Sequence, residues 1–247
     1  HVVCRRQRQM CIRDSLSFEL MNSGFLSDYD YTKLIFTATN NRKLNKLVFR
    51  SRAFFQFGNG SNWAPESKLY LSGSNLENMM NNKFTRSKGF INSEYLGYGE
   101  SINHFHHSGG LNLRGYSGYL APEYDDNGNF DFFGYNGTSG GSINLEVDFT
   151  SLIPRSINTI GIKPYIFADA GIITNKELSR ENFIDKFSEI RADAGIGFFI
   201  NVSQWTPLET VNPLTVRLDF PLFLNRPPAN DKDYFMFRWL FGISKLF

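Results

Sequence analysis

The C-terminal part of the sequence alternates strictly between apolar and polar side chains. In the stretch 142–150, apolar residues stand at every second position and polar residues stand between them. A period of two is that of a β-strand, in which successive side chains point to opposite faces. The apolar positions are Ile143, Leu145, Val147 and Phe149, and the polar ones are Asn144, Glu146 and Asp148. The pattern therefore predicts a strand with one apolar and one polar face.

The same alternation recurs along most of the chain, so the sequence predicts an all-β, antiparallel fold. The predicted strands cover residues 15–21, 28–39, 44–58, 66–72, 142–150, 160–173, 188–203, 213–224 and 234–247. The pair Asn40 and Asn41 predicts a turn between the second and third strands, because asparagine is common in hairpin turns. Two long stretches, 75–108 and 122–141, lack clear alternation, and we expect them to be loops.

Charged side chains fall opposite the apolar face in strand after strand. They are Glu146, Asp148, Asp169, Arg191, Asp193, Arg217, Asp219 and Arg238. An antiparallel sandwich fits this pattern, with its apolar faces forming a core, and so does a transmembrane β-barrel with a polar lumen. The last strand favours the barrel, because Phe235, Phe237, Trp239 and Phe241 on one face would promote aggregation in water. Several strands also reach about 9–11 residues, the length needed to cross a bilayer when tilted.

Composition agrees with a barrel and sets two other classes aside. Aromatic residues make up 16% of the chain, with 25 Phe and 11 Tyr, which suits many strands and aromatic girdles. No run of about 18 apolar residues predicts a transmembrane helix. The net charge is +2 and the basic residues are scattered among acids, so no nucleic-acid partner is predicted.

Residues 1–14 differ from the rest of the chain. They contain both cysteines, Cys4 and Cys11, and four arginines without hydrophobic periodicity. A Cys-x6-Cys pair fits a metal or disulfide clip, but the interpretation that we favour is a non-native, adapter-derived segment. This segment also lacks the apolar core of a signal peptide. We therefore expect residues 15–247 to be one barrel domain that is truncated at its N-terminus.

A glycine-rich stretch with one arginine is the strongest candidate for a functional loop. Glycine tolerates backbone angles that other residues avoid, so such a loop can turn tightly and still present one fixed cation. Its partners should be acids on neighbouring strands. The loop residues are Gly109, Gly110, Arg114, Gly115 and Tyr116, and the candidate partners of Arg114 are Glu146 and Asp169.

Three histidines precede this loop and raise the question of a metal site. His104 and His106 would share one face of a strand, and His107 follows them. No clear third ligand or general base accompanies them, whereas a zinc site has three or four protein ligands. We therefore predict no metal and no cofactor.

The order of these motifs resembles the C-terminal barrel half of the BamA superfamily, also called the bacterial surface antigen family. The resemblance covers roughly residues 109–247 and is carried by the loop, the strand of Glu146, Phe167-x-Asp169-x-Gly171, Arg191-x-Asp193-x-Gly195-x-Gly197 and a terminal phenylalanine. It implies the C-terminal portion of an antiparallel transmembrane β-barrel in the bacterial outer membrane, with the Arg-Gly-Tyr loop folded inward. Arg114 would then pair with Glu146 and Asp169. It also implies a C-terminal insertion signal at Phe241, Ile243 and Phe247.

The resemblance further implies a role in outer-membrane protein assembly or polypeptide translocation. The expected partners are outer-membrane lipid, outer-membrane protein clients and components of the assembly machinery. The alternative is a membrane anchor for a surface or periplasmic hydrolase, such as a peptidase, a phosphoesterase or a patatin-like lipase, whose catalytic domain lies upstream. A passive adhesin or porin fits less well, because an inward loop would occupy the lumen.

Two observations limit what the resemblance implies. The family's periplasmic repeat domains and its earliest strands are absent from this sequence, so barrel closure cannot be read from it. No His-Glu-x-x-His or P-loop motif occurs either, and we predict that this chain is not itself an enzyme.

Overall fold

The computed structural model describes residues 14–23, 27–81, 104–124, 127–152, 162–174, 187–202, 214–227 and 233–243. The adapter-like segment 1–13 and Phe247, on which predictions were made above, lie outside these ranges. Most of the described chain is β-strand, which confirms the predicted all-β class. Within the described residues, no helix is both long enough and apolar enough to cross a membrane.

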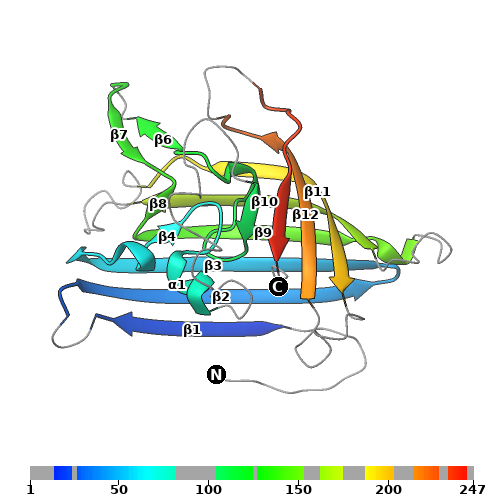
Figure 1. Ribbon diagram of the computed structural model, residues 1–247, viewed down its shortest axis with the longest axis horizontal. Helices are drawn as coiled ribbons and strands as arrows, with labels where there is room; N and C mark the ends of the chain where they lie inside the picture. Colours follow the sequence, from blue (N-terminus) through cyan, green and yellow to red (C-terminus); the bar gives the residue numbers. More distant parts are fainter. Residues whose placement is uncertain are drawn as a thin grey trace.

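One large sheet dominates the structure. Its strands, in spatial order, are β1 (Ser15–Asn22), β2 (Asp30–Leu44), β3 (Leu47–Asn62), β9 (Ser139–Asp148), β10 (Ile162–Thr174), β11 (Arg191–Val202), β12 (Leu214–Leu224), β13 (Leu240–Ile243) and β5 (Phe105–His107). All neighbours are antiparallel except β13 and β5, which are parallel. Figure 1 shows β2 and β3 running along the long axis, whereas β12 and β13 run across it. Among the described residues no pairing joins β1 to the far end, so the sheet is open there.

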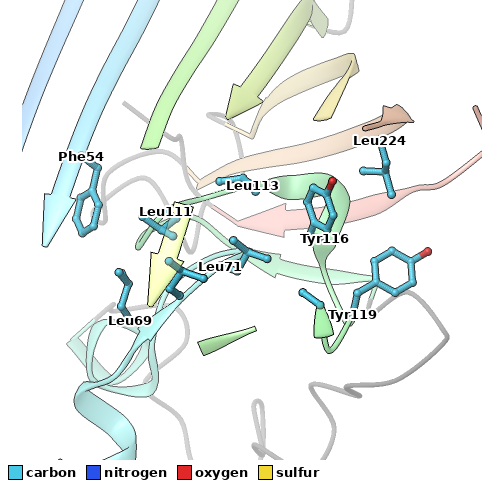
Figure 2. Packing of buried hydrophobic residues seen from close by; sticks show 10 residues of the cluster. Phe54, Leu69, Leu71, Leu111, Leu113, Tyr116, Tyr119 and Leu224 are labelled. Atoms are coloured by element: carbon cyan, nitrogen blue, oxygen red, sulfur yellow. The ribbon is translucent and has the colours of Figure 1, made fainter. Parts of the chain in front are cut away.

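The described residues between β3 and β9 form an insert of short elements. They are η1 (Pro65–Ser67), β4 (Leu69–Tyr70), α1 (Leu76–Asn81), β5, η3 (Arg114–Tyr116), β6 (Pro122–Tyr124), β7 (Phe130–Phe133) and β8 (Asn136–Gly137), and η4 (Thr150–Leu152) follows β9. Figure 2 shows how the insert packs on the sheet through a buried apolar cluster. Its members are Phe54, Leu69, Leu71, Leu111, Leu113, Tyr116, Tyr119, Ala121, Ile173 and Leu224.

The two faces of the sheet are reversed relative to a sheet of a protein dissolved in water. In β9, Ile143 and Leu145 are 58% and 46% exposed, whereas Asn144 and Glu146 are 0% and 1% exposed. The buried face also carries Lys33, Arg52, Gln56, Asp148, Asp169, Arg191, Asp193, Arg217, Asp219 and Arg238. The exposed face carries Leu16, Phe18, Leu20, Phe36, Phe49, Phe55, Ile166, Ile196, Phe237 and Trp239. Charged residues are rarely buried without partners, so the polar face must be internally paired.

These exposures confirm the predicted alternation and decide against the sandwich. In the described part of the chain no second sheet covers the apolar face, although a sandwich core would bury it. The buried side of the sheet is instead the polar one, and the insert lies against it.

Three details of the predicted strands were wrong. Asn40 and Asn41 continue β2 and pair with Ser51 and Arg50, because the turn is made further on, where Asn45 takes a left-handed φ of 54°. The predicted strand 66–72 contains the last two residues of η1 and only two strand residues, Leu69 and Tyr70. The predicted strand 234–247 contains the short β13, preceded by an isolated bridge from Phe235 to Phe223.

Gly110 allows the tight approach of the loop to the segment 70–73 of the insert. Its φ is +53°, and an added Cβ would lie 2.4 Å from the Gly73 carbonyl oxygen and 2.8 Å from that of Tyr70. A side chain there would meet both left-handed strain and rigid backbone. Gly128 also has a left-handed φ, +81°, but open space surrounds its Cβ position.

We therefore predict that Gly110→Ala lowers the free energy of unfolding more than Gly128→Ala does. The control should show only the left-handed penalty of about 1–2 kcal/mol, and Gly110→Ala should add a steric cost to it. Denaturant titration of both variants measures the difference. Equal losses would mean that the loop tolerates displacement from Gly73 and Tyr70.

Candidate functional site

The loop reaches the polar face of the sheet because its apolar side chains are held elsewhere. The backbone N–H groups of Leu111 and Leu113 donate to the carbonyl oxygens of Tyr70 and Leu71, at 3.2 and 3.0 Å. Both leucine side chains are fully buried in the apolar cluster. Arg114, which begins η3, lies against the sheet, and its side chain is 0% exposed.

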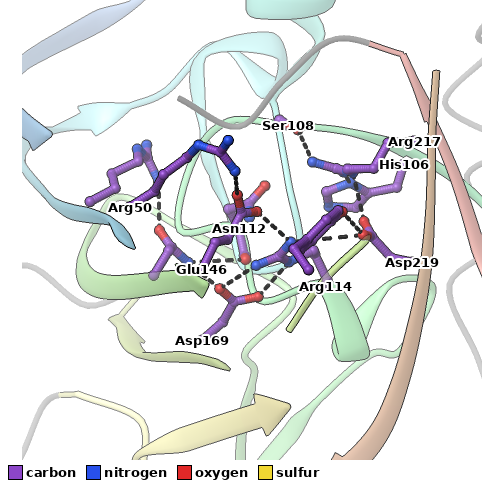
Figure 3. A network of polar contacts seen from close by, with 12 residues as sticks. Arg50, His106, Ser108, Asn112, Arg114, Glu146, Asp169, Arg217 and Asp219 are labelled. Carbon is purple, nitrogen blue, oxygen red and sulfur yellow. Dashed lines mark hydrogen bonds and ion pairs between the residues drawn. The ribbon is translucent and has the colours of Figure 1, made fainter. Parts of the chain in front are cut away.

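Arg114 binds two carboxylates on neighbouring strands (Figure 3). Its Nε and Nη2 donate to the two oxygens of Asp169 at 2.7 and 3.0 Å, and its Nη1 donates to Glu146 Oε1 at 2.8 Å. The guanidinium also lies over the ring of Phe167, 3.8 Å from its centroid. This geometry uses the planar fork of arginine, which the ammonium of lysine does not reproduce.

Strand register explains why the two acids meet. Glu146 of β9 lies opposite Phe167 of β10, and Asp169 lies opposite Asn144. The acids are therefore diagonal neighbours on the buried face. Asn144 Nδ2 donates to Asp169 Oδ1 at 3.0 Å and to the carbonyl oxygens of Leu111 and Asn112 at 3.2 Å, so it connects the acid to the loop backbone.

The electrostatic surroundings keep Arg114 charged. Burial alone would lower the pKa of Arg114, but the carboxylates of Asp169, Asp219 and Glu146 together raise it well above its ordinary value. Arg50 of β3 adds a second cation, 2.8 Å from Asp148 and 3.8 Å from Glu146. The acids around Arg114 are thus compensated, as buried charges must be.

The next two loop residues make separate contacts with β11 and the chain after β12. The backbone N–H of Gly115 donates to Asp193 Oδ2 at 3.1 Å, and an added Cβ would lie 2.4 Å from Leu224 Cδ2. The hydroxyl of Tyr116 donates to Asn225 Oδ1 at 2.7 Å. Burial, followed by the charge of Asp193, raises the pKa of Tyr116 to about 12, so it remains protonated.

Several functional contacts were missed by sequence reasoning. Glu123, in the stretch predicted to be an exposed loop, is buried and accepts hydrogen bonds from Arg191 and, at 3.1 Å, from Arg226. Arg217 of β12 binds His106 and Ser108 of the insert. The alternation of side chains predicted that Arg191 and Arg217 lie on the polar face. No local pattern indicated that they would contact Glu123 and His106, which are distant in sequence.

The remaining predicted site residues lie in two places, the start of the loop and strand β13. Gly109 and Gly110 form the turn that begins the loop, with φ values of +151° and +53°. Phe241 and Ile243, the described part of the predicted insertion signal, lie in β13 and are the backbone partners of Phe105 and His107 in β5. Phe247 lies outside the described residues.

The described residues do not present an arrangement for nucleophilic catalysis. One Gly-x-Ser-x-Gly pattern, 137–141, escaped the sequence analysis, but Ser139 begins β9, is fully buried and donates to the carbonyl oxygen of Gly58. A nucleophile elbow instead exposes its serine at a strand-to-helix turn. Ser74 contacts His107 Nδ1 at 2.9 Å, but its hydroxyl donates to the carbonyl oxygen of Ser108. In the described parts of the chain, no group of three or more His, Cys, Asp and Glu is placed to hold a metal ion.

A comparison of the chain with protein-family models gives no match, and neither does a comparison with curated proteins.

We predict that Arg114→Ala lowers the free energy of unfolding by about 3–5 kcal/mol, because it removes the cation that binds buried Asp169 and leaves Glu146 only the more distant Arg50. Arg114→Lys should restore only part of this loss, since an ammonium lacks the bidentate contact with Asp169. Exposed Arg42 of β2 supplies the matched control, and Arg42→Ala should change stability by about 0.5 kcal/mol or less.

A double-mutant cycle of Arg114→Ala with Asp169→Asn measures the pairing itself. A coupling energy near zero would contradict a structural role for the contact.

Proposed function

We propose that this chain forms the C-terminal wall of an outer-membrane β-barrel of the BamA superfamily type, and that it acts in assembling or translocating polypeptides. The observation that carries the proposal is the reversed sheet, with apolar side chains exposed and charged side chains buried. In water, such an apolar face would be unfavourable and prone to aggregate. In a bilayer it is the expected outer surface, and the polar face becomes the wall of a lumen.

The spanning segments in this proposal are β1, β2, β3 and β9 to β12. These strands pair through their backbones, which satisfies the hydrogen-bonding groups that lipid cannot satisfy. The three-residue strand β5 is too short to cross a bilayer and belongs to the insert. The barrel would place residues 104–124 inside the lumen, where Arg114 fastens them to the wall.

One feature supports a role with polypeptides over that of a passive pore. The insert covers the polar face and fills space that a diffusion channel needs open.

A lysine substitution tests the membrane part of the proposal. Leu145 lies in the middle of β9 and is 46% exposed, whereas Leu44 lies at the turn end of β2 and is 53% exposed. In lipid vesicles, Leu145→Lys should lower the free energy of unfolding by about 2–4 kcal/mol, and Leu44→Lys by about 0–1 kcal/mol, because the cost depends on depth. Equal small losses at both sites would place the apolar face in water.

A reconstitution assay tests the activity. The chain is inserted in lipid vesicles, an outer-membrane barrel protein unfolded in urea is added, and the rate at which it becomes protease-resistant is measured. Wild-type chain should accelerate this folding over empty vesicles, and Arg114→Ala should lose the acceleration, since the loop is released. The Arg42→Ala variant should behave as wild type. A wild-type rate equal to that of empty vesicles would refute the proposed activity.

A further inference from the structure

A second group of polar contacts joins the insert to the wall, and it meets the first at Asp219, whose Oδ1 lies 3.8 Å from Arg114 Nη1. Arg217 of β12 is fully buried, and its Nε lies 2.6 Å from Asp219 Oδ2. Its Nη1 donates to Ser108 Oγ at 2.6 Å, and its Nη2 donates to His106 Nδ1. Figure 3 shows Arg217 and His106 on the opposite side of Arg114 from Asp169. Here the wall supplies the guanidinium and the insert supplies neutral acceptors.

The ring of His106 is fixed by a contact on its other side. His106 is 2% exposed, and its Nε2 lies 2.6 Å from the carbonyl oxygen of Ser72. A carbonyl only accepts, so Nε2 carries the proton and Nδ1 presents a lone pair to Arg217. This arrangement requires a neutral imidazole.

The same histidine is the middle residue of β5, which occupies the edge of β13. His106 pairs with Gly242 in parallel register, and the N–H of Phe241 donates to the His104 carbonyl oxygen at 2.6 Å. Gly242 leaves room for Arg217, because an added Cβ would lie 3.1 Å from Arg217 Nη2. The side chain of Arg217 thus reaches His106 beside the point where β5 and β13 pair.

We propose that Arg217 is a positioning residue that holds β5 on the edge of β13 through its hydrogen bonds with His106 and Ser108, and that these contacts require His106 to be neutral. We call this set of contacts the seat of β5. The proposal rests on the proposed function, because it gives the luminal insert a second fastening point. While β5 is seated, the edge of β13 is not available to another strand, so loss of the seat would free it.

The charges around His106 make the seat sensitive to acid. Arg217 faces it from β12, Arg114 from η3 and His107 from β5, and Asp219 is already engaged by Arg217. No carboxylate of the described residues forms an ion pair with His106. Protonation would therefore remove the acceptor for Arg217 and place a cation against another cation.

The direction of the pH dependence follows from this geometry. Burial, followed by the charge of Arg217, lowers the pKa of His106 well below its ordinary value. In the released state we expect an ordinary pKa of about 6.5. The seat is therefore most stable above about pH 6.5. It loses stability as the pH falls below that value, because His106 binds a proton at a higher pH in the released state than in the seated state.

Hydrogen exchange in the full chain, reconstituted in lipid vesicles, tests the proposal. The measured quantity is the protection factor of peptides covering β5 and β13, corrected for the intrinsic exchange rate at each pH. His106→Gln keeps one donor and one acceptor without a titratable group, whereas His106→Leu removes both. At neutral pH, wild type and His106→Gln should be protected, and His106→Leu should exchange about tenfold or more faster.

The pH profile separates a positioning role from a merely structural one. Wild-type protection of β5 and β13 should fall as the pH drops below about 6.5, while that of His106→Gln should not. Arg42→Ala is the control, because Arg42 is an exposed arginine of β2. Equal profiles for wild type and His106→Gln would overturn the proposal, as would equal loss of protection in Arg42→Ala and His106→Leu.

This experiment and the reconstitution assay fail independently. Exchange reports only on the seat of β5, and client folding reports only on activity. The expected exchange profiles without acceleration of client folding would refute the proposed activity and leave the positioning role standing. Accelerated client folding together with pH-independent exchange in wild type would refute the positioning role and leave the proposed activity standing.

Discussion

The pairing of Arg114 with Glu146 and Asp169 is the interaction on which the arrangement of the insert depends. Two carboxylates on one buried face cannot remain charged without a cation, since desolvation is costly and like charges repel. The loop supplies that cation, and Asn144 ties the same acid to the loop backbone. The sheet therefore supplies the carboxylates of this contact, and the insert supplies the cation. The sheet needs the charge of the loop, and the contacts of the loop with Tyr70 and Leu71 of the insert place that charge against the sheet.

The insert is held to the sheet both by the buried apolar cluster and by polar contacts. Its own leucines pack within the apolar cluster, while arginines form the contacts with the polar face. The contacts differ in kind, because Arg114 meets carboxylates and Arg217 also meets a neutral imidazole and a hydroxyl. Contacts with carboxylates persist over a wide pH range, whereas a contact with neutral histidine ends when the ring is protonated.

Much of this architecture was readable from the sequence. Period-two alternation placed Ile143 and Leu145 on one face and Glu146 on the other, and the structure has them so. The glycines of the loop indicated a tight turn around Arg114, and the acids available on the polar face suggested Glu146 and Asp169 as its partners. Alternation works here because side-chain direction in a strand is a local property of the backbone. Turn positions were less certain, and the hairpin turns at Asn45 because that residue adopts the left-handed conformation.

What the sequence by itself determined is therefore the all-β class, the two faces of the strands and the loop that carries Arg114. Only the tertiary structure decided that the insert lies on the charged face, that Glu123 is buried against Arg191, and that His106 accepts a hydrogen bond from Arg217. These contacts join residues about seventy to more than one hundred positions apart, 68 for Glu123 and Arg191 and 111 for His106 and Arg217. Local pattern fixes which way a side chain points, but long-range contacts follow from strand order and register, which form only when the whole sheet assembles.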